Sequence, residues 1–168
     1  FDSSGLYVAG EELAGASIVV YGDNATIGGT TLADRNVIAG GVNGIVVNGS
    51  TGGAISGNYI GTDITGNTTI TTTFDGIRLE NGANNITVGG ATTAHRNIIA
   101  GISDDGVQVT GESSDNNTIQ NNRIGVSADG TTNLGIGGDG VFITDGADGT
   151  AVLDNHIASA GIVGVEID

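Results

Sequence analysis

The chain has 168 residues, and its 19 acidic side chains outnumber 4 basic ones, all arginine, giving a formal net charge of −15. Such a charge repels nucleic acid and anionic membranes, so neither is expected as a partner. Cysteine and proline are absent and 32 residues are glycine, which excludes a disulfide-stapled scaffold and a proline-rich linker. No apolar run approaches the roughly 18 residues of a membrane span, so membrane insertion is not expected.

The sequence repeats itself at two related spacings. Residues 24–40 return 61 positions further on as residues 85–101, and both copies contain an Arg-Asn-aliphatic-Ile-Ala-Gly string, at Arg35 and at Arg96. Residues 57–66 and 121–130 form a second pair, 64 positions apart. Regular self-similarity is typical of a solenoid, in which each unit buries its apolar face against its neighbours. We therefore expect one domain over residues 1–168.

Each repeat unit contains three short apolar motifs in a fixed order. The first is Gly-aliphatic-x-aliphatic and begins at Gly15, Gly44, Gly76, Gly106, Gly140 and Gly164. The second is a small residue followed by an aliphatic one and ends at Ile27, Ile55, Val88, Ile119 and Val152. The third is Asn-x-Ile and begins at Asn36, Asn58, Asn97, Asn122 and Asn155.

These motifs predict strands, because their apolar residues alternate with a period of two and Gly, Asn and Asp separate them. Three short strands per rung, with rungs about 4.8 Å apart, make an all-β parallel β-helix of about five to six rungs. One inward column would contain Ile45 and Val47, Ile77 and Leu79, Val107 and Val109, and Val141 and Ile143. Another would contain Ile38, Ile60, Ile99, Ile124 and Ile157.

The asparagines of the third motif occupy the same place in five successive rungs. Stacked amides can hydrogen-bond along such a column while they satisfy backbone groups of the turns, so we expect an asparagine ladder. The glycines before each first strand, and the pairs Gly28-Gly29 and Gly89-Gly90, are expected at turns that need unusual backbone angles. Loops alternate between two places, before the third motif and after it, so they should project from two different edges of the solenoid.

The strings Arg35-Asn-Val-Ile38, Asn58-Tyr-Ile-Gly-Thr-Asp63 and Asn84-Asn-Ile-Thr-Val-Gly-Gly90 resemble repeats of large bacterial cell-surface or secreted proteins with right-handed parallel β-helices. The broader superfamily is pectate-lyase-like, and the resemblance covers nearly the whole chain. It implies a right-handed coil. It leaves the activity open, because that superfamily includes lyases, epimerases, tailspikes, adhesins and non-catalytic spacers.

The resemblance also implies where chemistry would be found. In the polysaccharide-cleaving members, acids that hold calcium and an Arg or Lys project outward from one strand face. The matching positions here are Ser17, Val46, Arg78, Gln108, Phe142 and Glu166. They contain no stacked acid pair and a single base, Arg78, which departs from the lyase pattern and argues against cleavage.

The nearest substitute is a column of Asp75, Asp105 and Asp139, each directly before the glycine of a first motif. Carboxylates about 5 Å apart repel unless they are protonated, paired or bridged by a cation, and calcium prefers such oxygen-rich sites. One hypothesis is therefore a calcium site at these three residues, with Arg78 and Phe142 contacting a saccharide. The alternative is ordinary Asp-Gly turn chemistry with the carboxylates in water.

Two functions remain open. The first is a non-catalytic structural or adhesive segment of a secreted or cell-surface protein, a piece of a longer solenoid that requires no cofactor. The second is a calcium-assisted carbohydrate-active domain, a polysaccharide lyase or relative, or a polysaccharide-binding domain. The expected partners are a polysaccharide or another copy of the chain stacked end to end, because uncapped solenoid ends expose strand edges.

Overall fold

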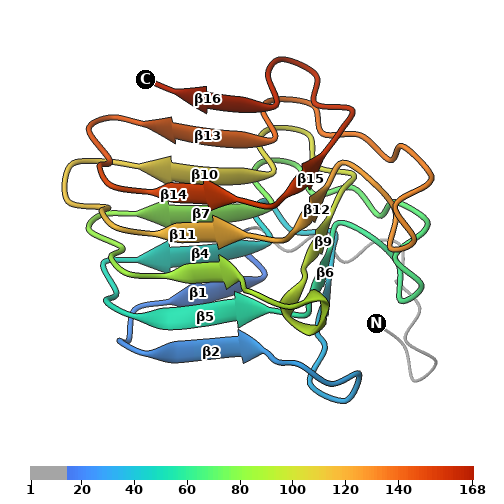
Figure 1. Cartoon of the computed structure of the whole chain (residues 1–168), viewed down its shortest axis with the longest axis horizontal. Coiled ribbons are helices and arrows are strands. Elements are labelled where there is room, and N and C mark those ends of the chain that lie inside the picture. Colours follow the sequence, from blue (N-terminus) through green and yellow to red (C-terminus); the bar gives the residue numbers. More distant parts are fainter. Residues whose placement is uncertain (1–14) are drawn as a thin grey trace.

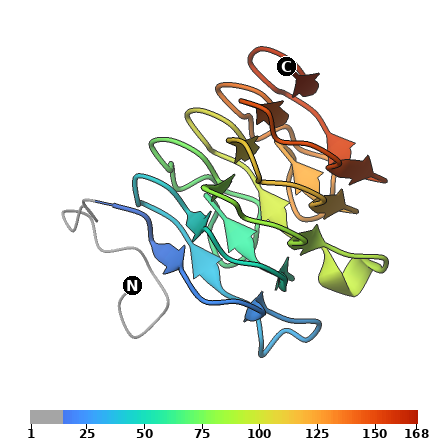
Figure 2. The ribbon, with the colours of Figure 1, turned by 90° about the vertical axis from the view of Figure 1, so that its left-hand side faces the viewer.

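The computed structural model describes residues 15–168, so the part of the predicted domain before Gly15 lies outside the described residues. Over this range the chain is all-β, with sixteen short strands and one turn of 3-10 helix, η1 (Thr93–His95). The chain coils through about five turns, and each turn adds a strand to each of three parallel sheets (Figures 1 and 2). The predicted parallel β-helix is confirmed.

The three sheets are formed by the three sequence motifs in turn. The first sheet contains β1 (Ile18–Val20), β4 (Ile45–Asn48), β7 (Ile77–Glu80), β10 (Val107–Thr110), β13 (Val141–Thr144) and β16 (Val165–Ile167). The second contains β2 (Ala25–Gly28), β5 (Gly53–Ser56), β8 (Thr87–Gly89), β11 (Thr118–Gln120) and β14 (Ala151–Leu153). The third contains β3 (Val37–Ile38), β6 (Tyr59–Ile60), β9 (Ile98–Ile99), β12 (Arg123–Ile124) and β15 (His156–Ile157).

The core is a stack of aliphatic side chains from all three sheets. The inward column predicted for the first sheet is confirmed, because its residues from Ile45 to Ile143 are at most 3% exposed. Ile60, Ile99 and Ile124 of the third sheet are fully buried as well. Each such side chain contributes about 1.5–3 kcal/mol through burial, and it does so only because a neighbouring rung covers it.

The first rung is displaced from its predicted register. Ile18 pairs with Ile45 and Val19 with Val46, so Ser17 lies opposite Gly44 and the motif of this rung does not begin at Gly15. The outward residue of this rung is therefore Val19 rather than Ser17. A shift of two residues keeps the same side chains on the same face of a strand, so alternation alone cannot detect it.

The asparagine ladder is present and continuous over five rungs. Each Nδ2 donates to Oδ1 of the next asparagine, at 2.9 Å from Asn36, 3.3 Å from Asn58, 3.0 Å from Asn97 and 3.0 Å from Asn122 to Asn155. The same Oδ1 atoms accept the backbone N–H of the preceding asparagine. From Asn58 onward Nδ2 also donates to a second-sheet carbonyl, as from Asn97 to Ile55 at 2.7 Å.

Glycines support this packing in two ways. Gly89 has φ +89°, as predicted for a turn, and a Cβ there would meet the carbonyl oxygen of Gln120 at 2.0 Å and the Asn122 amide. Gly106, which precedes β10, has no positive φ, so its predicted unusual backbone angle is wrong. A Cβ at Gly106 would lie 2.6 Å from the Gly140 carbonyl oxygen and 2.7 Å from Ile124 Cγ2. Close approach between rungs explains this glycine.

The loops alternate between two edges, as predicted. One kind lies between the second and third sheets, over residues 29–36 and 90–97, and the other between the third and first sheets, over residues 61–76 and 125–140. The latter two loops stack on each other, since the Ala128 N–H donates to the Gly66 carbonyl at 2.8 Å. They also lie against the third sheet, because positions 66 and 130 adjoin the side chains of Tyr59 and Arg123.

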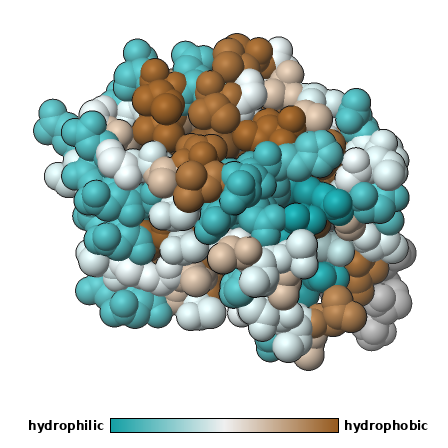
Figure 3. All heavy atoms as spheres, in the orientation of Figure 1, coloured by the Kyte–Doolittle hydropathy of each residue, from teal (hydrophilic) through white to brown (hydrophobic). Residues whose placement is uncertain are grey.

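The end of the solenoid that carries β16 exposes apolar side chains. Val165 and Ile167 are 39% and 71% exposed, whereas their partners Val141 and Ile143 in β13 are buried. Figure 3 shows apolar residues gathered at this end of the molecule. Among residues 15–168 there is no helix of the length and apolarity that a membrane crossing requires.

Candidate functional site

The carboxylates predicted from Asp-Gly pairs form a second ladder beside the first sheet. Asn43, Asp75, Asp105 and Asp139 occupy equivalent positions in four rungs, and we call them the aspartate ladder. Oδ1 of each accepts the backbone N–H of the next member, at 3.0, 3.4 and 2.8 Å. Oδ1 of Asp139 accepts the N–H of Val163 at 2.7 Å. The three aspartates are only 1–5% exposed, so they are not splayed into water as simple turn chemistry would have them.

In two of the three rungs, the second oxygen of the carboxylate accepts from the outward residue three positions later. Arg78 Nη1 donates to Asp75 Oδ2 at 3.1 Å, and Gln108 Nε2 donates to Asp105 Oδ2 at 3.1 Å. In the next rung the outward residue is Phe142, which pairs with Gln108 across the sheet and has no group to donate. Along three rungs, the side chain beside the ladder changes from a cationic donor to a neutral amide donor to a phenyl ring that donates nothing.

Burial sets the protonation chemistry of this column. Burial raises the pKa of Asp75 to about 6, against the opposing effects of the hydrogen bond and charge of Arg78, and the charge of Asp105 raises it further. Burial likewise raises the pKa of Asp105, which the Asp139 N–H lowers and the charges of Asp104 and Asp139 raise. Buried carboxyl groups with raised pKa values occur at functional sites and also in structural networks.

Arg78 is bound on both sides by acids. Its Nε donates to Glu80 Oε2 at 2.7 Å, in addition to the ion pair with Asp75. Glu80 Oε1 accepts from Asn48 Nδ2 of the preceding rung at 2.8 Å. Glu80 was not among the predicted site residues, although it follows Arg78 by two positions and so lies on the same face of β7. With two carboxylates on it, Arg78 carries little uncompensated charge.

An open groove of about 290 Å³ adjoins Arg78 on this face. It is lined by Val42, Asn43, Val46, Phe74, Arg78 and Glu80. Phe74 is 52% exposed, so its ring is available for contact. Phe142, the aromatic predicted to accompany Arg78, lies two strands away, because Gln108 of β10 pairs with both of them. The structure therefore brings Asp75 and Arg78 together and places Phe74, rather than Phe142, beside them.

The three aspartates lie in successive rungs rather than around one point. In the part of the chain that the structure describes, no group of three or more His, Cys, Asp or Glu side chains is arranged to hold a metal ion. Each Oδ1 already accepts a backbone N–H, and Oδ2 of Asp75 and of Asp105 accepts from Arg78 and Gln108. Calcium binding by Asp75, Asp105 and Asp139 stays a prediction.

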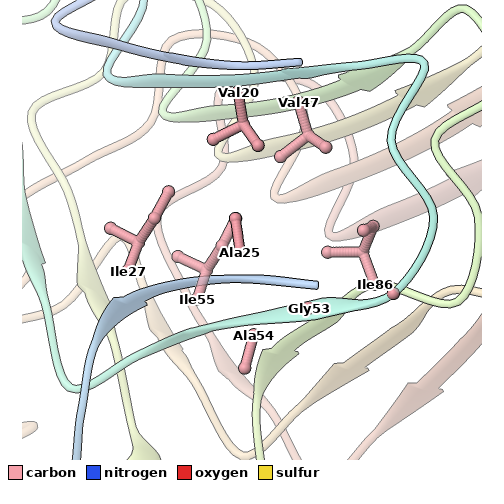
Figure 4. Close-up of a pocket in the computed structure, with 9 residues that line it drawn as sticks. Val20, Ala25, Ile27, Val47, Gly53, Ala54, Ile55 and Ile86 are labelled. Carbon is pink, nitrogen blue, oxygen red and sulfur yellow. The ribbon is translucent and has the colours of Figure 1, made fainter. Parts of the chain in front are cut away.

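A second space lies inside the solenoid, between the first and second sheets at β1, β2, β4 and β5. Its volume is about 10 Å³, and its wall consists of aliphatic side chains and backbone, including Val20, Ile27, Val47, Ile55 and Ile86 (Figure 4). Gly53 and Ala54 contribute little volume on the second-sheet side. A space of this size holds at most about one water molecule, and an apolar wall gives that water no partner. This is a packing gap and not a ligand site.

Comparison of the chain with protein-family models, with curated proteins and with solved structures found no match. The parallel β-solenoid therefore rests on the structure itself, and the resemblance to bacterial surface proteins stays an expectation. Because a solenoid of this kind supports many activities, the fold alone does not select one.

Proposed function

We propose that this chain is a structural or adhesive β-solenoid segment of a secreted or cell-surface protein, a stiff rod that displays loops and catalyses no reaction. The observation that carries the proposal is the aspartate ladder. Its buried carboxylates accept backbone N–H groups from the next rung, so the acids best placed for catalysis are engaged in holding rungs together. The single arginine beside them is already bound by Asp75 and Glu80.

A stiff rod also accords with the two continuous ladders. Hydrogen bonds from side chains cross every rung boundary between Asn36 and Asn155, in addition to those of the three sheets. Polar groups inside a protein rigidify it when they are fully satisfied. The loops at residues 61–76 and 125–140 are then the variable surface that such a rod would display, because loops on a rigid scaffold usually carry recognition.

The test is a cleavage assay on a panel of acidic and neutral polysaccharides, with calcium and with chelator. We expect no release of reducing ends or unsaturated products from any of them. Cleavage that requires calcium and is lost in Arg78→Ala would overturn the proposal. The matched control is Arg35→Ala, which removes an arginine from the loop before β3 and leaves the Asp75–Arg78 pair intact.

A second candidate function is carbohydrate binding without cleavage in the groove beside Arg78. It is supported by the exposed ring of Phe74 next to the polar groups of Asn43, Arg78 and Glu80, since sugar sites combine a flat apolar surface with a few polar groups. Because Arg78 is compensated by two acids, the groove suits a neutral sugar better than an acidic one. Phe74→Ala should weaken binding of a neutral oligosaccharide about tenfold, whereas Phe142→Ala should leave it unchanged.

End-to-end association with another copy is a further part of the rod proposal. The exposed side chains of Val165 and Ile167 on β16 support it, because strand edges with apolar neighbours are templates for pairing. Sedimentation should reveal association that Ile167→Lys abolishes. A wild-type chain that stays monomeric at high concentration would contradict end-to-end association. It would not contradict the proposal that the chain is a stiff, non-catalytic rod.

A further inference from the structure

Three of the four arginines gather on one side of this acidic protein. Arg35 and Arg96 directly precede the ladder residues Asn36 and Asn97, and Arg123 directly follows Asn122. Arg123 is also an outward residue of β12, in register with His156 on one side and Ile98 on the other. We call Arg35, Tyr59, Arg96 and Arg123 the arginine face. It spans the third sheet and the loops that precede β3 and β9, and it is separate from the groove beside Arg78 on the first sheet.

The arginine face contains two copies of one arrangement, in which an arginine Nε donates to a backbone carbonyl of the next rung. Arg35 Nε donates to the carbonyl of Gly57 in the next rung at 3.1 Å, and its guanidinium carbon lies 3.9 Å from the centre of the Tyr59 ring. Two rungs on, Arg96 Nε donates to the carbonyl of Asn121 at 3.0 Å, and Arg123 takes the place that Tyr59 has in the first copy. The pair Arg35–Tyr59 thus corresponds to the pair Arg96–Arg123.

Neutral groups hold these guanidinium groups in place. Arg96 Nη2 donates to Asn121 Oδ1 at 2.5 Å, and Arg123 Nη1 donates to the carbonyl of Ala128 in the loop above it. Over residues 15–168 both ion pairs are made by Arg78. Within this described range, the other three arginines are held by hydrogen bonds and have no carboxylate bound to them.

Two carboxylates in the loops beside this face, Asp34 and Asp129, are engaged within those loops. Asp34 Oδ2 accepts from the N–H and hydroxyl of Thr31. Asp129 Oδ1 accepts from the hydroxyl of Ser127 and from Thr131, and these hydrogen bonds, with a smaller effect of the Arg123 charge, lower its pKa to about 2. Asp129 therefore stays ionised and weakens the field of Arg123 without forming an ion pair with it.

The like charges of Arg96 and Arg123 repel each other. Burial lowers the pKa of Arg96, and the charge of Arg123 lowers it further. A single anionic group between two guanidinium groups would relieve this repulsion, and the planar fork of arginine matches a carboxylate or sulfate with two parallel hydrogen bonds. The side chains are partly exposed, so an anion can approach them.

We propose that the arginine face binds a linear acidic polysaccharide that runs along the solenoid axis. Arg35 and Arg96 are two rungs apart, which is about 10 Å at the spacing of parallel strands. A glycan with one carboxylate or sulfate per disaccharide carries its charges at a comparable interval. Nucleic acid is a poorer fit, because its phosphates are much denser and the net charge of −15 repels a dense polyanion more strongly.

The test uses immobilised hyaluronan, which alternates a uronate with a neutral sugar, and its carboxyl-reduced form. We expect the chain to bind hyaluronan at low salt, to bind it more weakly as salt rises, and not to bind the carboxyl-reduced polymer. Arg96→Gln and Arg123→Gln should each weaken binding about tenfold. The control Leu153→Gln changes an exposed side chain of β14 in the second sheet and should leave binding unchanged.

Several outcomes would overturn the proposal. They are absence of binding to hyaluronan, equal binding to the carboxyl-reduced polymer, an equal loss in the Leu153→Gln control, or tighter binding to single-stranded oligonucleotide than to hyaluronan. If Arg123→Gln does not fold, the wild-type chain still tests the proposal. Its binding to hyaluronan should weaken as salt rises and should be absent with the carboxyl-reduced polymer. Failure here leaves the rod proposal intact, because that proposal is tested by cleavage and not by binding.

Discussion

Asp105 and Asp139 lie in adjacent rungs, and Oδ1 of Asp105 accepts the backbone N–H of Asp139 at 2.8 Å. In the other direction, the Asp139 carbonyl accepts the N–H of Gly106 at 2.8 Å. Two hydrogen bonds of opposite direction thus join the rungs at this point. The carboxylate takes the role that an amide has in the asparagine ladder, and Asn43 fills the same position one rung before Asp75.

Asp105→Asn should leave the fold intact and raise its stability at neutral pH. An asparagine Oδ1 can still accept the Asp139 N–H, as Asn43 does for Asp75, and the buried negative charge is removed. Its Nδ2 could also donate to Gln108 Oε1, which is buried without a partner. Thermal unfolding at pH 7.5 should show a higher midpoint for the variant. A large drop in the midpoint would mean that the charge itself is needed.

The stability of the chain should fall as pH rises from about 4 to 7. Burial raises the pKa of Asp75 from 3.8 to about 6, so the folded state holds a proton that the unfolded state has already released in this interval. The contribution is fully present below pH 3.8 and is lost as pH rises through about 6, at a cost on the order of 3 kcal/mol. Urea unfolding at several pH values measures it.

Asp75→Asn is the control for this pH dependence, since other acids also titrate in the interval. Relative to the wild type, the variant should show a shallower fall in unfolding free energy between pH 4 and 7. Parallel curves for the two proteins would contradict the assignment to Asp75.

Asn97→Ala should lower the free energy of unfolding by about 1–3 kcal/mol. The substitution leaves the buried Ile55 carbonyl and the Asn58 N–H without their partners, which lie at 2.7 and 2.9 Å from the Asn97 side chain. Chemical denaturation measures the change. Asn36→Ala is the matched control at the start of the ladder, where the side chain is partly exposed, and it should cost less. Equal costs would show that the ladder is not held more tightly in its interior.

Ile99→Ala should cost about 2–5 kcal/mol, because Ile99 is fully buried and a neighbouring rung covers it on each side. Leu32→Ala is the comparison, since Leu32 is 79% exposed in a loop and its truncation should change stability by less than about 0.5 kcal/mol. Both values come from the same denaturation experiment. Similar small changes in the two variants would place Ile99 outside the core.

Removal of divalent cations should leave the melting temperature unchanged, because hydrogen bonds already satisfy Oδ1 of every aspartate in the ladder. The measurement compares thermal unfolding in EDTA and in millimolar calcium. A rise in the melting temperature with calcium that disappears in Asp105→Asn would instead establish the calcium site predicted from the three aspartates.

Much of the fold was predictable because each rung repeats the same pattern. The alternation around Ile77 and Leu79 and the recurrence of Asn97 and its equivalents specify three strands, an inward face and a ladder without knowledge of any contact. The register of the first rung was missed, because Ser17 stands where later rungs have glycine and alternation does not detect a shift of two residues.

The candidate site was predictable only in part. The contact between Asp75 and Arg78 follows from their separation of three positions in one rung. The position of Phe74 depends on how the loop before β7 packs, and no sequence periodicity predicts a loop conformation. Glu80 could have been found, since it lies on the same strand face as Arg78. The correspondence of Arg96–Arg123 with Arg35–Tyr59 needed the stacking of rungs, which brings together residues that are 24 to 27 positions apart in sequence.

The sequence by itself determined that this chain is a β-solenoid with an aliphatic interior and an asparagine ladder. The reason is that aliphatic residues and asparagines recur at fixed places in every rung, and this recurrence specifies which side chains are buried and which form hydrogen bonds along the stack. Only the tertiary structure decided what the acids and arginines do. Asp105 is buried and accepts a backbone N–H, and three arginines lie on one side of the solenoid with no ion pair among residues 15–168. Side-chain burial and charge pairing depend on neighbours from other rungs. That difference separates the parts of the molecule that hold it together from the surface it offers to a ligand.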